Sequence, residues 1–148
     1  MSKHGPPRRG AEEGSVAVEA AFIVPLLLLV LIGGVEFGRA FWTYHRMLLA
    51  VEEAGRYAMV YAASPSLLTA ASCPGVSGSV TLSNCAVAKA NAYLAAYGTT
   101  GVTVTPSEDT SSPKNLTITA TRSFNFIAPN LLPFGPINLS TQVKVPEI

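Results

Sequence analysis

The sequence predicts an α+β protein in which a long N-terminal transmembrane helix extends into a small outer domain. Three observations predict this fold class: an apolar run of membrane-spanning length, a helical spacing of apolar residues beyond it, and a strand-like alternation in the last third of the chain. The predicted domain contains a second short helix and a three-stranded, mainly antiparallel sheet, which hides one face of each strand.

The apolar run covers residues 16–35 and reads VAVEAAFIVPLLLLVLIGGV, with Glu19 as its one ionisable residue. A helix of this length spans about 30 Å, which matches the hydrocarbon core of a bilayer. A carboxylate inside a membrane helix costs several kcal/mol unless it is neutralised or partnered. Glu19 is therefore a candidate assembly residue, and the alternative is a side chain at the cytoplasmic headgroup boundary.

Two further features of the run concern helix shape and packing. Pro25 removes a backbone hydrogen bond and predicts a kink near Phe22, which is either a tolerated defect or an assembly hinge. Gly34 and Gly38 form a Gly-x-x-x-Gly pair, which would let a second helix approach closely, although such pairs also occur by chance.

The residues before the run, 1–14, are polar and have no apolar periodicity, so we expect a flexible cytoplasmic leader. Four basic side chains in this leader place the N-terminus in the cytoplasm and the rest of the chain outside, namely Lys3, His4, Arg8 and Arg9. Membrane lipid is thus an expected partner.

Beyond the run, apolar residues recur at intervals of three and four and form one face of a continuing helix: Phe37, Phe41, Tyr44, Leu48, Val51, Ala54, Ala58 and Tyr61. Pro65 forbids continuation, so one segment of transmembrane and extended helix covers residues 15–64, and an α+β domain covers 65–148. Phe41, Trp42 and Tyr44 also fall where an interfacial aromatic belt is expected.

Within the domain, residues 64–84 are expected to form a loop and residues 86–97 a short helix ended by Gly98. The packing face of this helix is predicted to hold Val87, Ala90, Tyr93 or Leu94, and Tyr97. Apolar residues then alternate with polar ones around 102–104, 116–124 and 137–145, which predicts three strands. Residues 106–114 and 129–136 are the expected connections.

Cys73 and Cys85 are the two cysteines of the chain. Their spacing matches neither a redox Cys-x-x-Cys pair nor a metal quartet, so a disulfide is the leading interpretation in an oxidising compartment, and two free thiols are the alternative. Closing such a loop would stabilise the fold by roughly 3 kcal/mol.

Composition limits the possible functions. The 148 residues are 49% hydrophobic and 13% charged, and a net charge of +1 offers no basic field for nucleic acid. No Ser, Cys or Asp is paired with a plausible base, and neither histidine has a neighbour at ligand spacing. We therefore expect no enzyme activity, no cofactor and no metal site.

Several of these residues together resemble a known family. Gly14, Glu19, Pro25 and the stretch from Phe37 to Ala40 are similar to TadE-like minor pseudopilins of tight-adherence (Flp/Tad) pilus systems, over roughly residues 14–63. The resemblance implies that a prepilin peptidase cuts between Gly14 and Ser15, and that Glu19 serves in assembly. The implied partners are other pilins or pseudopilins and the Tad assembly platform.

The resemblance also implies a place and a role. The chain would be a structural subunit that supports assembly of a tight-adherence type IV pilus and surface attachment, anchored in a bacterial inner membrane with its domain in the periplasm. One alternative is an unprocessed bitopic anchor or scaffold subunit of a secretion apparatus. A secreted protein with a removed signal peptide is a poorer match, because the apolar stretch is too long.

Overall fold

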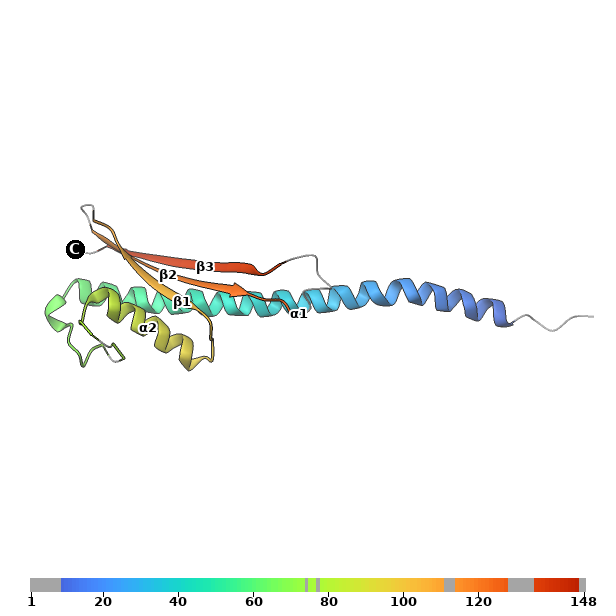
Figure 1. Ribbon diagram of the computed structural model, residues 1–148, viewed down its shortest axis with the longest axis horizontal. Helices are drawn as coiled ribbons and strands as arrows, with labels where there is room; N and C mark the ends of the chain where they lie inside the picture. The colour runs from blue at the N-terminus through green and yellow to red at the C-terminus, as the bar shows by residue number, and fades with distance from the viewer. Residues whose placement is uncertain (1–8, 74, 77, 111–113, 128–134, 147–148) are drawn as a thin grey trace, which may run out of the picture.

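The computed structural model describes residues 9–73, 75–76, 78–110, 114–127 and 135–146 (Figure 1). Its elements are the helix α1 (Arg9–Ala62), a 3-10 turn (Pro65–Leu67), the helix α2 (Leu82–Ala96) and the strands β1 (Thr103–Glu108), β2 (Asn115–Phe124) and β3 (Ile137–Pro146). The predicted fold class is confirmed: a long apolar helix, a second short helix and a three-stranded antiparallel sheet.

Helix α1 begins at Arg9, inside the segment that the sequence assigned to a flexible leader. Ala11, Glu12 and Glu13 favour this earlier start, because they are good helix formers and acidic residues are stabilising near a helix N-terminus. The helix continues through Pro25, and its projecting part curves visibly in Figure 1. Lys3, His4 and Arg8, on which the predicted orientation depends, lie outside the described residues.

The sheet has the order β1-β2-β3, and both pairings are antiparallel. Strand β1 extends to Glu108, so the predicted connection at residues 106–114 starts too early. Pro106 takes part in the pairing opposite Ile118. Proline is tolerated here because β1 is an edge strand, where one row of backbone groups needs no partner.

The sheet lies over a layer made of the two helices (Figure 1). Strands β2 and β3 cover α1, and β1 covers α2. The core between the layers is formed by fully or almost fully buried residues: Met47, Ala50, Val51, Ala54, Ala58, Ala86, Ala90, Leu94, Leu116, Ile118, Ala120 and Val145. Gly55 lets the helix and the sheet approach closely, because a Cβ atom there would lie 3.1 Å from a methyl carbon of Val143.

The buried face of α1 differs from the prediction in its membrane-proximal half. Phe37, Phe41 and Tyr44 are exposed, and the buried positions there are Glu36, Ala40, Thr43 and Met47. The reason is that the large side chains of this part of the core come from the sheet and not from the helix. Phe124, at the end of β2, and Phe126, just after it, pack against the small Ala40. Further along, the predicted core residues Val51, Ala54 and Ala58 are indeed buried.

Helix α2 begins at Leu82, four residues earlier than predicted. The hydroxyl of Thr81 accepts a hydrogen bond from the backbone N–H of Asn84 at 3.3 Å, which caps the helix N-terminus. Gly98 follows the helix with a φ of 64°, as its predicted capping role requires. The buried face contains Ala86, Ala90 and Leu94, whereas Tyr97 is exposed.

Cys73 and Cys85 lie at disulfide distance, with their Cα atoms 5.2 Å apart. Cys85 is in the first turn of α2, and Cys73 is in the preceding loop. The hydroxyl of Tyr57 on α1 donates a hydrogen bond to the carbonyl oxygen of Ser72 at 2.9 Å. The loop is therefore fastened to both helices at adjacent residues.

Candidate functional site

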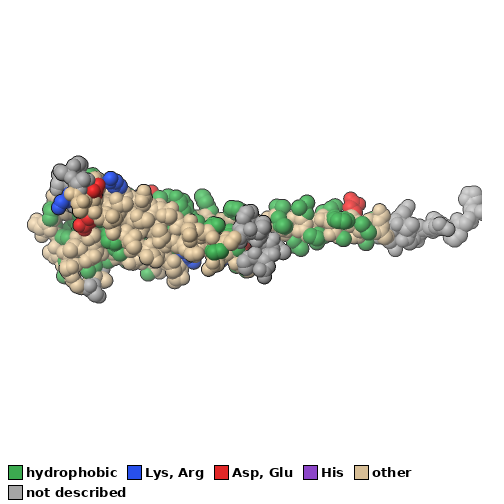
Figure 2. All heavy atoms as spheres, turned by 45° about the horizontal axis from the view of Figure 1, so that its top comes forward, with side chains coloured by type: hydrophobic (Ala, Val, Ile, Leu, Met, Phe, Trp, Pro, Cys, Tyr) green, Lys and Arg blue, Asp and Glu red, His purple; other side chains and the backbone are tan. Residues whose placement is uncertain are grey.

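The first functional feature is the projecting half of α1. Every side chain from residue 14 to residue 31 is exposed, and this half extends well beyond the domain (Figures 1 and 2). It is long and apolar enough to cross a membrane, and none of its most apolar window is buried inside the chain. This one N-terminal apolar helix fits a single-pass membrane anchor.

Glu19 lies in this projecting half and is exposed. Within the described part of the chain, its carboxylate has no ion-pair or hydrogen-bond partner. A carboxylate that entered a bilayer in this state would need a partner from outside the chain or a position at the headgroups.

The other predicted site residues of α1 also present open surface. Gly14 and Ser15 are exposed and lie within the helix. A Cβ atom at Gly14, Gly34 or Gly38 would meet nothing within 4 Å. Gly34 and Gly38 therefore leave a shallow face, one helical turn long, that a second helix could approach.

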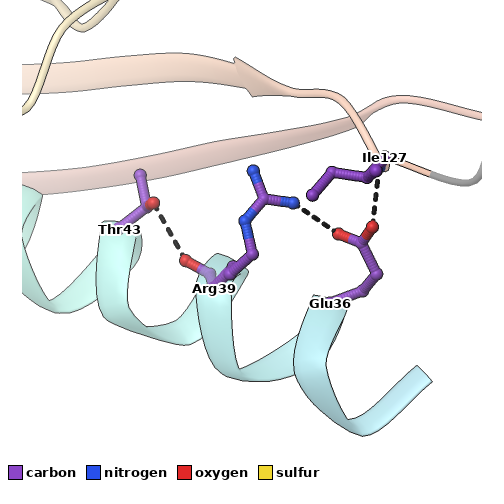
Figure 3. Close-up of polar contacts among 4 residues, drawn as sticks. All are labelled: Glu36, Arg39, Thr43 and Ile127. Carbon is purple, nitrogen blue, oxygen red and sulfur yellow. Dashed lines mark hydrogen bonds and ion pairs between the residues drawn. The ribbon is translucent and has the colours of Figure 1, made fainter. Parts of the chain in front are cut away.

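The second feature lies where α1 enters the domain, and the sequence reasoning missed it. The Glu36 carboxylate is 2% exposed and is held from two sides (Figure 3). One oxygen accepts a hydrogen bond from the backbone N–H of Ile127 at 2.7 Å, and the other pairs with the Arg39 guanidinium at 2.7 Å. We call this arrangement of Glu36, Arg39 and Ile127 the junction cluster.

The junction cluster fixes the chain that follows β2 onto α1. A buried carboxylate is costly without partners, so the two contacts of Glu36 make its burial tolerable. Arg39 also lies over the Phe124 ring, with its central guanidinium carbon 5.4 Å from the ring centroid. The Thr43 hydroxyl donates to the Arg39 carbonyl oxygen at 2.9 Å, one turn further along. The cluster thus joins helix and sheet at the end of the apolar run.

The residues that match a known protein family lie on this same helix. Residues 14–56 match the family model described as TadE-like protein. The match is consistent with a TadE-like protein, as the resemblance predicted, and this family indicates involvement in Tad pilus systems as a structural, pilus-associated group. No curated protein and no solved structure matches the chain.

The TadE-like match contains Gly14, Glu19, Pro25 and both residues of the Glu36–Arg39 pair, and it ends before α2 and the sheet. It therefore covers the apolar anchor and the side of α1 that receives the domain. A family of this kind implies association with pilus or Tad components in general.

A third feature of the TadE-like segment is a stacked arginine. The Arg46 guanidinium contacts the faces of two aromatic rings, 4.4 Å from the centroid of Trp42 and 4.3 Å from that of Tyr97. Tyr97 directly follows α2, so this stack ties the end of α2 to α1. Trp42 itself is 62% exposed and close to the apolar run.

Among the residues that the structure describes, no group of three or more His, Cys, Asp or Glu side chains is placed to hold a metal ion. The arrangement on α1 can instead do three things: enter lipid, present a carboxylate to another subunit, and hold a folded domain at a fixed position above the apolar run.

Proposed function

We propose that this chain is a minor pseudopilin-like structural subunit that supports assembly of a tight-adherence type IV pilus and thereby surface attachment. One observation carries the proposal: the TadE-like segment contains a projecting apolar run, residues 16–35, whose one ionisable residue, Glu19, has no ion-pair or hydrogen-bond partner among the described residues. Other pilins or pseudopilins and the Tad assembly platform are the proposed partners.

Glu19 is proposed to act in assembly. In the apolar interior of a membrane or a helix bundle, its carboxylate gains most from a cation on a neighbouring subunit, because opposite charges attract strongly where water is excluded. A new N-terminal ammonium is such a cation. Cleavage between Gly14 and Ser15 by a prepilin peptidase would create it, and would make Glu19 the fifth residue of the mature chain.

Cleavage at Gly14 also requires local opening of α1, because a protease binds its substrate in an extended form. Glycine costs a helix about 1 kcal/mol relative to alanine, so Gly14 is a favourable place for the helix to open. We further propose that the domain is periplasmic and the N-terminus cytoplasmic. The disulfide distance of Cys73 and Cys85 supports an oxidising compartment for the domain.

The assembly role is tested with Glu19→Ala, and with Glu52→Ala as the matched control. Glu52 is on the same helix outside the apolar run, in a loose pair with Arg56 at 3.8 Å. We expect Glu19→Ala to leave membrane insertion intact and to reduce the number of surface pili several-fold, as counted by electron microscopy. The control should retain normal pili. Normal piliation in Glu19→Ala cells would end the assembly role.

Processing is tested by the intact mass of the membrane-extracted protein, with and without reductant. We expect a mature chain that begins at Ser15, and a mass increase of two hydrogens upon reduction of the cysteine pair. A full-length chain in cells that hold the matching peptidase would remove the cleavage claim.

The second candidate function is an unprocessed bitopic anchor or scaffold subunit of a secretion apparatus. The observation that favours it is the unbroken course of α1 from Arg9 through Gly14 and Ser15. In this case the leader stays attached and Glu19→Ala has no effect, so the two experiments above separate the candidates.

A further inference from the structure

A groove whose polar lining includes two arginines lies beside the junction cluster, where the apolar run ends. It has a volume of about 480 Å³, and its lining includes Val35, Gly38, Arg39, Trp42 and Arg122. Four of these residues come from α1, and Arg122 comes from β2. The groove therefore exists only because the sheet is docked on the helix.

The charge of this groove is positive. Arg39 is neutralised by Glu36, as the 2.7 Å contact shows. Arg122 is half-buried, and no acidic side chain of the described residues pairs with it. Within the described residues, one guanidinium without an acidic partner therefore lines the groove together with Arg39, which uses only its Nη1 nitrogen in the pair with Glu36. Two such groups suit a phosphate, which accepts several charge-assisted hydrogen bonds.

The groove also lies at the level of lipid headgroups if the apolar run spans the bilayer. Arg39 is four residues beyond Val35 and Trp42 is seven beyond it, which corresponds to about 6 Å and about 10 Å along the helix. The headgroup layer occupies roughly 5–8 Å on each side of the hydrocarbon core. Trp42 is attached just beyond this layer, but helical side chains point back toward the helix N-terminus, so its ring can lie in the layer that tryptophan prefers.

An apolar groove continues from the polar one toward the anchor. It is lined by Leu31, Ile32, Val35, Glu36 and Ile127. Val35 lines both grooves, so the polar and apolar parts adjoin. Ile127 is 71% exposed although its backbone is held by Glu36, which leaves its side chain available to a hydrophobic neighbour.

We propose that these two grooves together bind one anionic phospholipid, with its phosphate against Arg39 and Arg122 and its acyl chain along Leu31 and Val35. The continuity of the apolar groove with the exposed anchor argues for lipid as the occupant, and the positive charge argues for an anionic headgroup. The inference rests on membrane anchoring by α1, and it does not depend on pilus assembly.

Trp42 makes the inference directly measurable, because it is the single tryptophan of the chain. The full chain is reconstituted in two sets of phosphatidylcholine vesicles. One set contains a small fraction of brominated phosphatidylglycerol, and the other contains the same fraction of brominated phosphatidylcholine. In both lipids the bromine atoms lie near the glycerol end of the acyl chains. One basic side chain near a membrane surface enriches an anionic lipid about fivefold. We expect brominated phosphatidylglycerol to quench Trp42 fluorescence correspondingly more strongly than brominated phosphatidylcholine.

Arg122→Gln should bring the two lipids to equal quenching. The matched control is Arg56→Gln, which removes one positive charge from an exposed position of α1 further from the anchor and should keep the preference. Gly38→Leu is a second test that leaves all charges in place. Its position faces open space, so the variant should fold, fill the groove and weaken the preference.

Four outcomes would overturn the proposal. Equal quenching of the unmodified chain by both lipids would indicate ordinary lipid contact, and absence of quenching by either would place Trp42 away from the headgroups. Loss of the preference upon addition of inorganic phosphate would indicate a site for the free anion. Loss of the preference at high protein density would indicate that a second copy of the chain covers the groove. None of these results bears on the piliation of Glu19→Ala cells, so a failure of the lipid proposal can be distinguished from a failure of the proposed assembly function.

Discussion

Helix α1 has two halves whose apolar side chains have opposite surroundings. Residues 16–35 are rich in Leu and Val, and their large side chains are exposed except for the half-buried Ile32. From residue 40 to residue 58 the buried side of the same helix is mostly small: Ala40, Ala50, Ala54, Gly55 and Ala58. Figure 1 shows the consequence, because the sheet and α2 lie only along the second half.

The difference shows that side-chain size, rather than hydrophobicity, separates the anchor from the core. Small residues let α2 and the sheet come close to α1, as Gly55 and Val143 illustrate. Large aliphatic residues serve better in lipid, where the contact is with fluid chains and no partner surface must be matched.

The strongest test removes one large apolar side chain from each half. Met47→Ala should lower the free energy of unfolding of the domain by about 2–5 kcal/mol, because Met47 is fully buried and its loss leaves a cavity. Leu28→Ala, in the exposed half, should leave domain stability almost unchanged. Thermal or chemical unfolding in detergent, followed by circular dichroism, measures both. An equal loss in the two variants would break the distinction between the halves.

The covalent link of the domain gives the next largest effect. Replacement of both cysteines, Cys73→Ser with Cys85→Ser, should lower domain stability by roughly 3 kcal/mol, because the open loop gains entropy in the unfolded state. Reductant should produce the same loss in the unmodified protein and no further loss in the double variant. A protein whose stability is insensitive to reductant would show that the two thiols are free.

The junction between the halves should respond more modestly. Glu36→Ala leaves the Ile127 N–H and the Arg39 guanidinium without their acceptor, which should cost about 1–3 kcal/mol. Arg39 is 44% exposed, so water partly replaces its lost partner. Hydrogen exchange at the Ile127 amide should accelerate markedly, while Glu52→Ala should leave this amide unchanged. Unaltered protection of Ile127 in Glu36→Ala would contradict the role of the junction cluster.

Much of the fold could be predicted because its periodicities are local. The alternation of Leu116, Ile118 and Ala120 with threonines predicts a strand with one buried face, and these three residues are fully buried. The apolar run likewise predicts the anchor from length alone. Such patterns depend only on residues that are close together in the sequence, so a single sequence is enough to recognise them.

The junction cluster could not be predicted in this way. Glu36 and Ile127 are separated by 91 residues. The donor at Ile127 is a backbone N–H, which every residue type except proline has, so the residue type gives no indication of this contact. The exposure of the aromatic residues near Glu36 could not be predicted for a related reason. A periodicity argument assigns large apolar side chains to the core, but beside a membrane they also have a second favourable environment. The spacing of Glu36 and Arg39, one turn apart directly after the run, was the one available signal. The assembly role of Glu19 depends on partners outside the chain and stays a prediction.

The unbroken course of α1 from anchor to domain has a mechanical consequence. A pull on the anchor along the helix axis reaches the domain without passing through a flexible joint. The load is then spread in shear over the whole length of helix that faces α2 and the sheet, so many contacts must slide together before any one separates. A subunit built in this way should withstand traction far better than one hung from a peptide linker of the same length.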